Sequence, residues 1–287
     1  MTDRRRNNGP SEGTLPIFYP DEPATTLPAP RDRQPDELRK FFLKTSLTPP
    51  ASGSSYLELP SPPSPTQQST LKLAVTVTGP RPLPHSAPFA PQARLTTELK
   101  YAPFAAQKRR GYIRDGGERE LATMITTALV RSIVLERYPK SSIEIMVTVL
   151  DCEDGPHGDV GVLSGAITAG SAALADAGVE CVDLVCGGVA GLDGNGRVVL
   201  DPGPGECTAV VGVGYLAARD EMTVLWTRGG MSVELEEDQM DIGGETEMER
   251  VIQAACKAAR EVRKVLNEAV AEKLVVELEE KENAMRE

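Results

Sequence analysis

Four residues with carboxylate side chains lie in a loop whose surroundings in the sequence are typical of an anion-binding site. Residues 147–150 (VTVL) are an apolar, β-branched run typical of a buried strand, and residues 161–177 are rich in Ala, Leu and Ile and end at a helix stop signal, Gly178. A glycine-containing loop that leads into a helix N-terminus normally binds an anion through its backbone N–H groups. Here no Lys or Arg lies in the loop, and its acids are Asp151, Glu153, Asp154 and Asp159. The sequence therefore predicts an anion site that has lost its affinity for phosphate.

Metal, disulfide and nucleophile chemistry are all disfavoured. The chain has five cysteines, no CxxC pair and two histidines, which argues against a zinc site or a disulfide framework. Cys152 lies near His157, but the acids between them would hold the imidazole and raise the pKa of the thiol. The glycine-rich segments match neither a P-loop nor a dinucleotide fingerprint. We expect no cofactor and no metal.

Net charge limits any polyanion contact to a local surface. The 287 residues carry a net charge of −11, which excludes nucleic-acid binding over the whole surface. Residues 94–119, however, include seven basic residues and only three acidic ones. The densest part of this basic loop is Lys108, Arg109, Arg110 and Arg114. No apolar run is long enough to suggest a membrane span.

The elements expected to position these residues alternate between strands and helices. Residues 118–138 show helical spacing of apolar residues up to Pro139, and a long closing helix begins at 246 and is expected to fray after 273. Gly79-Pro80-Arg81-Pro82 is expected to end the second strand. The expected strands are 54–59, 71–78, 93–101, 142–150, 182–189, 197–200, 207–216 and 222–226. This order predicts an α+β fold, with mixed sheets and packed helices in a single domain.

Composition divides the chain into three parts. Residues 1–30 are rich in Pro, Asn, Ser and charge, and predict a disordered or peripherally docked arm. Residues 31–270 form the expected domain. Residues 271–287 are the charge-dense end of the last helix.

Several short segments of the sequence resemble segments of one protein family and occur in the same order. These are ASGSSYLEL, a strand that ends in TGPR, LKYAPFAAQKRRG, RYPKSSIEIMVTVLDCEDG and LSGAITAGSAALADAGV. Together they resemble the ribonuclease PH family over about residues 36–270. The resemblance implies a ribonuclease PH-like fold (ribosomal protein S5 domain 2-like). It also implies descent from enzymes that cleave RNA from the 3′ end with phosphate.

The resemblance also shows where catalytic residues are replaced. Active family members hold phosphate with an arginine, and Asp159 or its neighbour falls at that position, where a carboxylate would repel phosphate. Thr208 stands where a catalytic aspartate belongs in a word resembling GEADMPV. The earlier acid of the pair falls at Pro202, with Asp201 one residue away. We therefore predict a degenerate site with no catalytic residue.

The function implied by the resemblance is a non-catalytic ring subunit of the RNA exosome. It would scaffold a six-membered ring of ribonuclease PH-like subunits, dock S1/KH-type cap subunits and line the channel that RNA threads. Lys108, Arg109, Arg110 and Arg114 would contact that RNA, unless the loop is merely solvated or contacts a subunit. The expected location is nucleus, nucleolus and cytoplasm. The alternatives are an active phosphate-dependent 3′–5′ exoribonuclease that uses Asp201 and Glu206, and a free-standing RNA-binding module.

Overall fold

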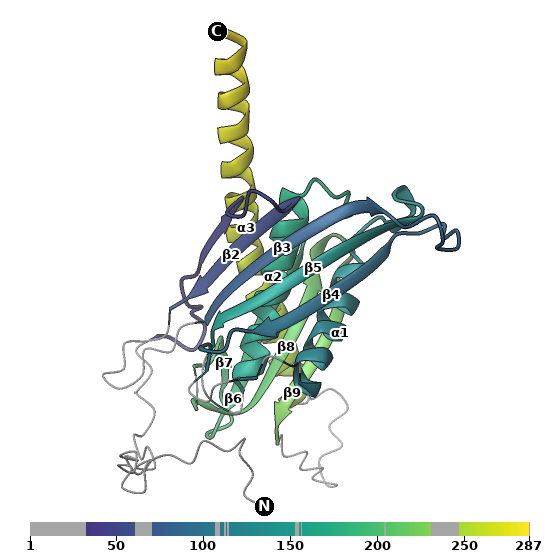
Figure 1. The fold of residues 1–287 in the computed structure, drawn as a ribbon. Helices are drawn as coiled ribbons and strands as arrows, with labels where there is room; N and C mark the ends of the chain where they lie inside the picture. Colours follow the sequence, from purple (N-terminus) through teal and green to yellow (C-terminus); the bar gives the residue numbers. More distant parts are fainter. Residues whose placement is uncertain are drawn as a thin grey trace, which may run out of the picture.

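Two β-sheets enclose a central helix, α2 (Gly158–Asp176), in the computed structural model of the chain (Figure 1). The structure describes residues 33–60, 71–106, 110–111, 113, 115–152, 155, 157–203, 205–230 and 247–286. The other helices are α1 (Gly116–Val130) and α3 (Glu247–Arg286). The strands are β1 (Phe42–Thr45), β2 (Gly53–Leu59), β3 (Leu71–Pro82), β4 (Arg94–Tyr101), β5 (Ser141–Asp151), β6 (Val185–Asp193), β7 (Val198–Leu200), β8 (Cys207–Leu216) and β9 (Glu221–Gly229).

The first sheet has the strand order β1-β2-β3-β5-β4. Its pairs are antiparallel except for β4 and β5, which run parallel. The alternation predicted for residues 71–78 is confirmed, since every second side chain of β3, from Leu71 to Val77, is buried. These side chains face α2, so the first sheet has one buried face and one outer face.

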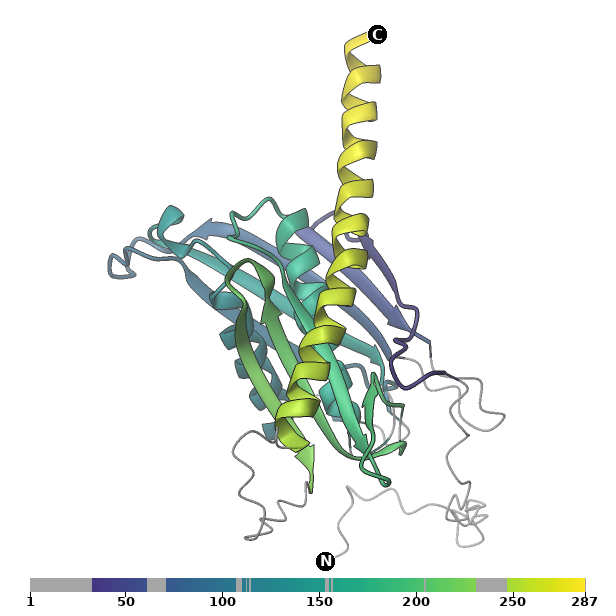
Figure 2. The ribbon, with the colours of Figure 1, turned by 180° about the vertical axis from the view of Figure 1, so that it is seen from behind.

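The second sheet lies on the other side of α2 and has the order β7-β6-β8-β9, with all pairs antiparallel. Helix α3 covers its outer face, as the view from behind shows (Figure 2). Helix α1 packs beside α2, between β4 of the first sheet and β9 of the second. The predicted α+β class and the mixed sheets with packed helices are confirmed.

Close packing on α2 requires small residues on both sides. A Cβ atom on Gly53 of β2 would lie 2.3 Å from the Ala173 carbonyl oxygen, and one on Gly187 of β6 would lie 2.2 Å from that of Ser164. By length and composition, helix α2 is apolar enough to cross a membrane. However, 72% of its apolar stretch is buried inside the protein. Its hydrophobicity is therefore accounted for by its place between the sheets.

Helix α1 is shorter than the 118–138 predicted from apolar spacing. It ends at Val130, and a short 3-10 helix, Leu135–Arg137, follows. The residues between them pair with the chain that leaves α2, through a bridge between Ile133 and Cys181. Ile133 is buried, with 6% of its surface exposed, although it lies outside the helix. The prediction was wrong because the spacing of apolar residues indicates which residues are buried, and a buried residue that follows a helix can fit the helical spacing.

Further boundaries differ from the predictions. Strand β3 does not end at Gly79 but continues to Pro82, and its pairing with β5 is irregular between Thr78 and Arg81, where the proline lies. The strand predicted at 182–189 is β6, which spans Val185–Asp193, and residues 42–45, where no strand was predicted, form β1. The predicted arm, residues 1–30, lies outside the described residues, and the predicted domain limits stay predictions.

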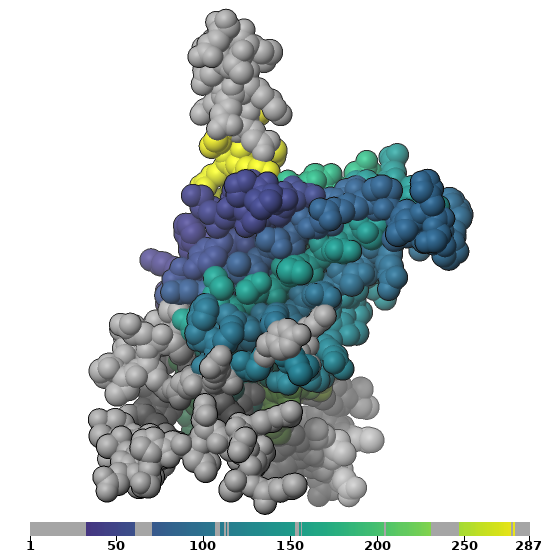
Figure 3. Space-filling view, viewed as in Figure 1, coloured from purple at the N-terminus to yellow at the C-terminus, as the bar shows by residue number. Residues whose placement is uncertain are grey.

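Helix α3 continues to Arg286, and the fraying predicted after 273 stays a prediction. Lys273 anchors the helix to the body, because its Nζ lies 2.5 Å from the buried carboxylate of Asp176 at the end of α2. Beyond this ion pair the helix projects past both sheets (Figure 1), and Figure 3 shows the base of the projection, in yellow, next to the N-terminal strands, in purple. The side chains that follow include Leu274, Val275 and Val276, each more than half exposed.

The contact between β6 and α3 gives a test of the packing. A Cβ atom on Gly188 would lie 2.1 Å from the Ala255 carbonyl oxygen, whereas one on Gly194 would meet nothing within 4 Å. We expect Gly188→Ala to lower the free energy of unfolding by about 1–3 kcal/mol through overpacking. Gly194→Ala should stay within about 0.5 kcal/mol of wild type. Urea unfolding followed by Trp226 fluorescence checks this, and equal midpoints for the two variants would contradict it.

Candidate functional site

The predicted site residues lie around the first turn of α2. Asp159 is the second residue of that helix. Asp201 follows β7, and Thr208 is the second residue of β8. Glu153 and Asp154 of the acidic loop lie outside the described residues. Within the described chain, no group of three or more His, Cys, Asp or Glu side chains is arranged to hold a metal ion.

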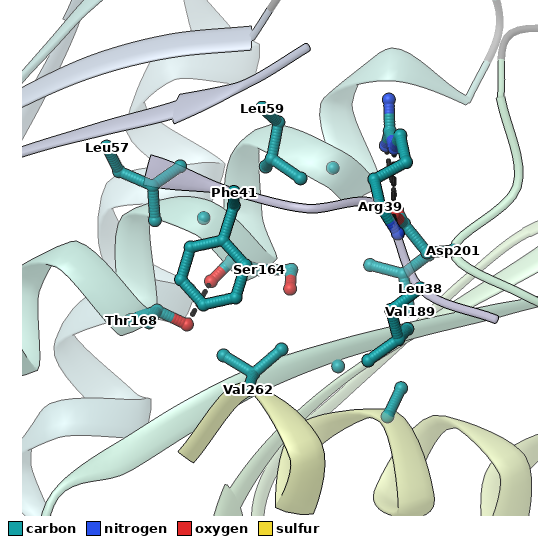
Figure 4. Close-up of a pocket in the computed structure, with 14 residues that line it drawn as sticks. Leu38, Arg39, Phe41, Leu57, Leu59, Ser164, Thr168, Val189, Asp201 and Val262 are labelled. Carbon is teal, nitrogen blue, oxygen red and sulfur yellow. Dashed lines mark hydrogen bonds and ion pairs between the residues drawn. The ribbon is translucent and has the colours of Figure 1, made fainter. Parts of the chain in front are cut away.

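Asp201 is fully engaged by arginines of the N-terminal segment. Its Oδ2 accepts hydrogen bonds from the Nε and backbone N–H of Arg39, at 2.8 Å and 3.1 Å, and its Oδ1 accepts one from Nη2 at 2.7 Å. Nη1 of Arg33 lies 3.8 Å from the same carboxylate. The pair is nearly enclosed, with 5% of the Arg39 side chain and 13% of the Asp201 side chain exposed (Figure 4).

These contacts set the protonation state of Asp201. Burial alone would raise the pKa of its carboxyl, but the charge and hydrogen bonds of Arg39, with the charge of Arg33, outweigh burial and hold the pKa below its ordinary value. The residue also has a φ of 46°, in the left-handed region that costs a non-glycine residue energy. A carboxylate so held is a structural ion-pair partner and is poorly suited to exchange protons with a substrate.

The segment that carries Arg39 closes the crevice beside α2. This N-terminal strap, residues 33–41, also accepts a hydrogen bond of 2.8 Å at the Pro35 carbonyl from the N–H of Leu200. Phe41 and Leu38 of the strap line a cavity of about 40 Å³ against α2, β6 and α3 (Figure 4). A second cavity, lined by Arg39, His157 and Asp201, measures about 20 Å³. That volume has room for about one water molecule.

Asp159 sits in a different environment. Its side chain is 41% exposed, its Oδ1 accepts a hydrogen bond of 3.1 Å from the Tyr101 hydroxyl, and its Oδ2 lies 3.9 Å from Nη2 of Arg228. Burial, and then the negative charge of Asp159, raise the pKa of Tyr101 well above its ordinary value, so the hydroxyl stays protonated and donates. A carboxylate that contacts a tyrosine hydroxyl and an arginine therefore stands at the start of α2.

The other two candidate residues also have structural partners. The Thr208 hydroxyl donates to the Leu192 carbonyl at 3.2 Å. One carboxylate oxygen of Glu206 accepts from the N–H of Gly203 at 2.9 Å, which shapes the loop before β8. Neither contact brings these side chains to Asp201. Each of the two acids, Asp201 and Glu206, therefore has a partner within the protein.

The predicted basic loop is described only at Arg110, since Lys108, Arg109 and Arg114 lie outside the described residues. The guanidinium of Arg110 stacks on the Tyr101 ring, 3.7 Å from its centroid. Sequence reasoning missed two features of this region: the arginine that engages Asp201 from 162 positions away, and the stacking of Arg228 on Trp226. No local pattern signals the first contact, whereas the spacing of Trp226 and Arg228, two residues apart on one strand, places both on the same face.

The two sheets around α2, with α1 and α3 packed on them, define a ribonuclease PH-like fold. Residues 37–180 match the model of domain 1 of the 3′ exoribonuclease family (RNase PH). The chain belongs to this family, as its sequence resemblance predicts.

Two relatives show which proteins of this family the chain is similar to. The exosome complex component MTR3 of Chaetomium thermophilum is 43% identical over 94% of this chain and 100% of its own length. The human protein of that name is 36% identical over 70% of this chain and 69% of its own length. The words FLKT and ASGSSYLEL resemble the exosome ring subunit called mRNA transport regulator 3, and these relatives confirm that resemblance.

Solved structures confirm the fold. Rice Rrp46 covers 84% of this chain and 98% of its own with a TM-score of 0.65 at 20% identity. A chain of the Archaeoglobus fulgidus exosome with RNA bound to the active site covers 81% of this chain and 90% of its own, with a TM-score of 0.60 at 17% identity.

The Arg39–Asp201 pair predicts a large loss of stability when one partner is removed. Arg39→Met removes two side-chain hydrogen bonds and the closest positive charge from the buried Asp201 carboxylate, which keeps the backbone N–H of residue 39 and the more distant Arg33. We therefore expect the free energy of unfolding at pH 7 to fall by up to about 3–5 kcal/mol. Arg137→Met is the matched control, because Arg137 is 68% exposed and should change stability by no more than about 0.5 kcal/mol. Urea unfolding compares the two, and equal effects would contradict a structural role for Arg39.

The lowered pKa of Asp201 predicts an acid dependence with a definite sign. Stability from this group is present above the unfolded pKa of about 3.9, and it is lost as the pH falls through the folded value, which lies lower. Wild type should therefore lose stability in acid more steeply than Asp201→Asn. Unfolding midpoints measured from neutral pH down to pH 3 check this, and parallel curves would refute it.

Proposed function

We propose that this chain is a non-catalytic ring subunit of the RNA exosome that supports 3′–5′ RNA processing and degradation. The MTR3 relatives support membership of that assembly. The observation that supports a non-catalytic role is the contact of Arg39 with Asp201. Arg39 pairs with this candidate acid, and together they leave only a small cavity beside the start of α2. The contribution of the chain is then scaffold, channel wall and docking surface for cap subunits.

The proposal includes the partners. Other ribonuclease PH-like subunits would flank the chain in a six-membered ring, with S1/KH-type cap subunits above and RNA in the channel. Strands β4 and β9 end their sheets, so each presents a strand edge to a neighbour. The same proposal places the protein in nucleus, nucleolus and cytoplasm.

The alternative, a phosphate-dependent exoribonuclease, requires Asp201 or Glu206 to act as an acid and a cation to hold phosphate at the start of α2. The described residues offer Asp159 at that position, and the two acids have the partners given above. Arg228 is a cation near the start of α2, but it lies 3.9 Å from the Asp159 carboxylate, which offsets its charge. The partners of the two acids therefore support the non-catalytic proposal.

One experiment separates the two functions. The tagged chain, purified from its own cells with its partners and also alone, is incubated with a tailed RNA and phosphate. We expect ribonuclease PH-like and S1/KH-type proteins to co-purify in comparable amounts, and we expect no nucleoside diphosphate that depends on this chain. Release of diphosphates that is lost in Glu206→Gln but kept in Thr208→Ala would contradict the non-catalytic proposal. Purification of the chain without such partners would contradict its place in the ring.

A further inference from the structure

A groove of about 680 Å³ lies between α1 and the outer edge of β4, which run side by side (Figure 1). Among the described residues β4 pairs with β5 alone, so its other edge has no strand neighbour. The facing wall is one stripe of α1 and its C-cap, in which most side chains are small. The stripe consists of Arg119, Ala122, Thr123, Thr126, Thr127, Val130 and Arg131. Space is therefore left beside an unpaired strand edge.

Thr97 of β4 lines this groove with a hydroxyl that has no partner. The residue is 9% exposed, and its Oγ1 is buried without a hydrogen bond to any described residue. Such a group is destabilising and rare in folded proteins. The threonines of the opposite wall differ, because Oγ1 of Thr123 and of Thr126 donates to a carbonyl of α1 itself. The Thr97 hydroxyl is therefore available to a group that enters the groove.

Arginines stand at both ends of the groove. Arg119 lies at the start of α1, and Arg131 at its end. Within the part of the chain that the structure describes, exposed Arg94 and Arg119 have no ion-pair partner, whereas Arg131 pairs with Glu221 at 2.6 Å. The acid that lines the groove, Glu118, is 3% exposed, and its carboxylate accepts hydrogen bonds from two backbone N–H groups. The groove is thus basic on a protein whose net charge is −11.

An edge strand beside a helix fits an extended polypeptide better than a nucleic acid. The backbone of the edge can pair with an added strand, and side chains of the helix contact its other side. Arg119 and Arg131 lie about 18 Å apart along α1 at 1.5 Å per residue. An extended segment of about five residues spans that length. No aromatic side chain of the described residues lines the groove, so bases would find nothing to stack on.

We propose that this groove docks an extended, acidic segment of a partner protein as an added strand on β4. Carboxylates toward the ends of the segment pair with Arg94 and Arg119, and its backbone or a polar side chain completes the hydrogen bonding of Thr97. The inference rests on the proposed function, which brings neighbours to the edge of β4. It goes further by naming what that edge receives, a linear acidic segment in place of a folded surface.

A designed peptide tests the groove on the purified full chain. It alternates threonine and valine between a glutamate at each end, carries fluorescein, and is followed by anisotropy as the chain is added. One control peptide has lysine in place of both glutamates, and another has proline at its centre. We expect the acidic peptide to bind and the lysine peptide not to bind. The proline peptide should bind more weakly, because proline lacks the N–H that an added strand donates.

Two variants separate a binding role from a structural one. Thr97→Val should weaken binding of the acidic peptide about fivefold, yet leave the urea midpoint of the chain unchanged or higher, because the lost hydroxyl has no partner in the free chain. Arg119→Glu should weaken binding at low salt by about fivefold or more. Arg137→Glu is the matched control, since Arg137 is 68% exposed on another element and should leave binding unchanged.

A crosslink identifies the natural segment in the assembled protein. Benzoylphenylalanine replaces Thr123, which is exposed on the groove wall, and the chain is irradiated in its own cells and purified. We expect crosslinks to a protein segment with a net negative charge, at a yield that Arg119→Glu lowers and Arg137→Glu does not. Crosslinks to RNA or to a basic segment would overturn the inference.

The peptide assay can also overturn it. Failure of the acidic peptide to bind, equal affinity for the acidic and lysine peptides, or equal affinity of Arg119→Glu and Arg137→Glu would each do so. These results leave the proposed function standing if the chain still co-purifies with its ring partners. Conversely, a chain that binds the acidic peptide through Thr97 but is purified without such partners would refute the proposed function and keep the groove.

Discussion

The burial of α2 between two sheets is the constraint on which the rest of the structure depends. A helix enclosed on two sides needs small side chains where strands approach, and α2 supplies Ala166, Ala169, Gly170 and Ala173 at buried positions. The strands contribute Gly53 and Gly187 at their closest approaches. Since so little space remains, α2 has no freedom to slide. Its first turn is therefore fixed as well.

Two carboxylates lie near that first turn in different environments. Asp201 is enclosed and paired, and its charge serves to hold the N-terminal strap over the cavity beside α2. Asp159 is exposed, accepts a hydrogen bond from Tyr101 and lies 3.9 Å from Arg228. The charge of Asp201 is therefore used inside the protein, whereas the charge of Asp159 faces solvent.

Local patterns predicted most of the fold. Alternation located β3, the apolar run located β5, and Gly178, with a φ of 68°, ended α2 as expected. The errors came where burial and secondary structure separate, as at Ile133, or where a strand tolerates proline, as at Pro80. The partners of the site were not predictable in this way. Arg39 and Asp201 lie 162 residues apart, and only the three-dimensional path of the strap brings them together.

The ion pair between Lys273 and Asp176 has a consequence for the reach of the molecule. Residues 274–286 continue α3 beyond this anchor, and at 1.5 Å per residue they extend it by about 20 Å. A helix of that length is marginal in water on its own, because nucleation is costly. Here the anchored turns act as the nucleus and the free turns propagate from them. The projecting turns thus continue a helix that is nucleated where α3 packs on β6 and β8 and pairs with Asp176 through Lys273.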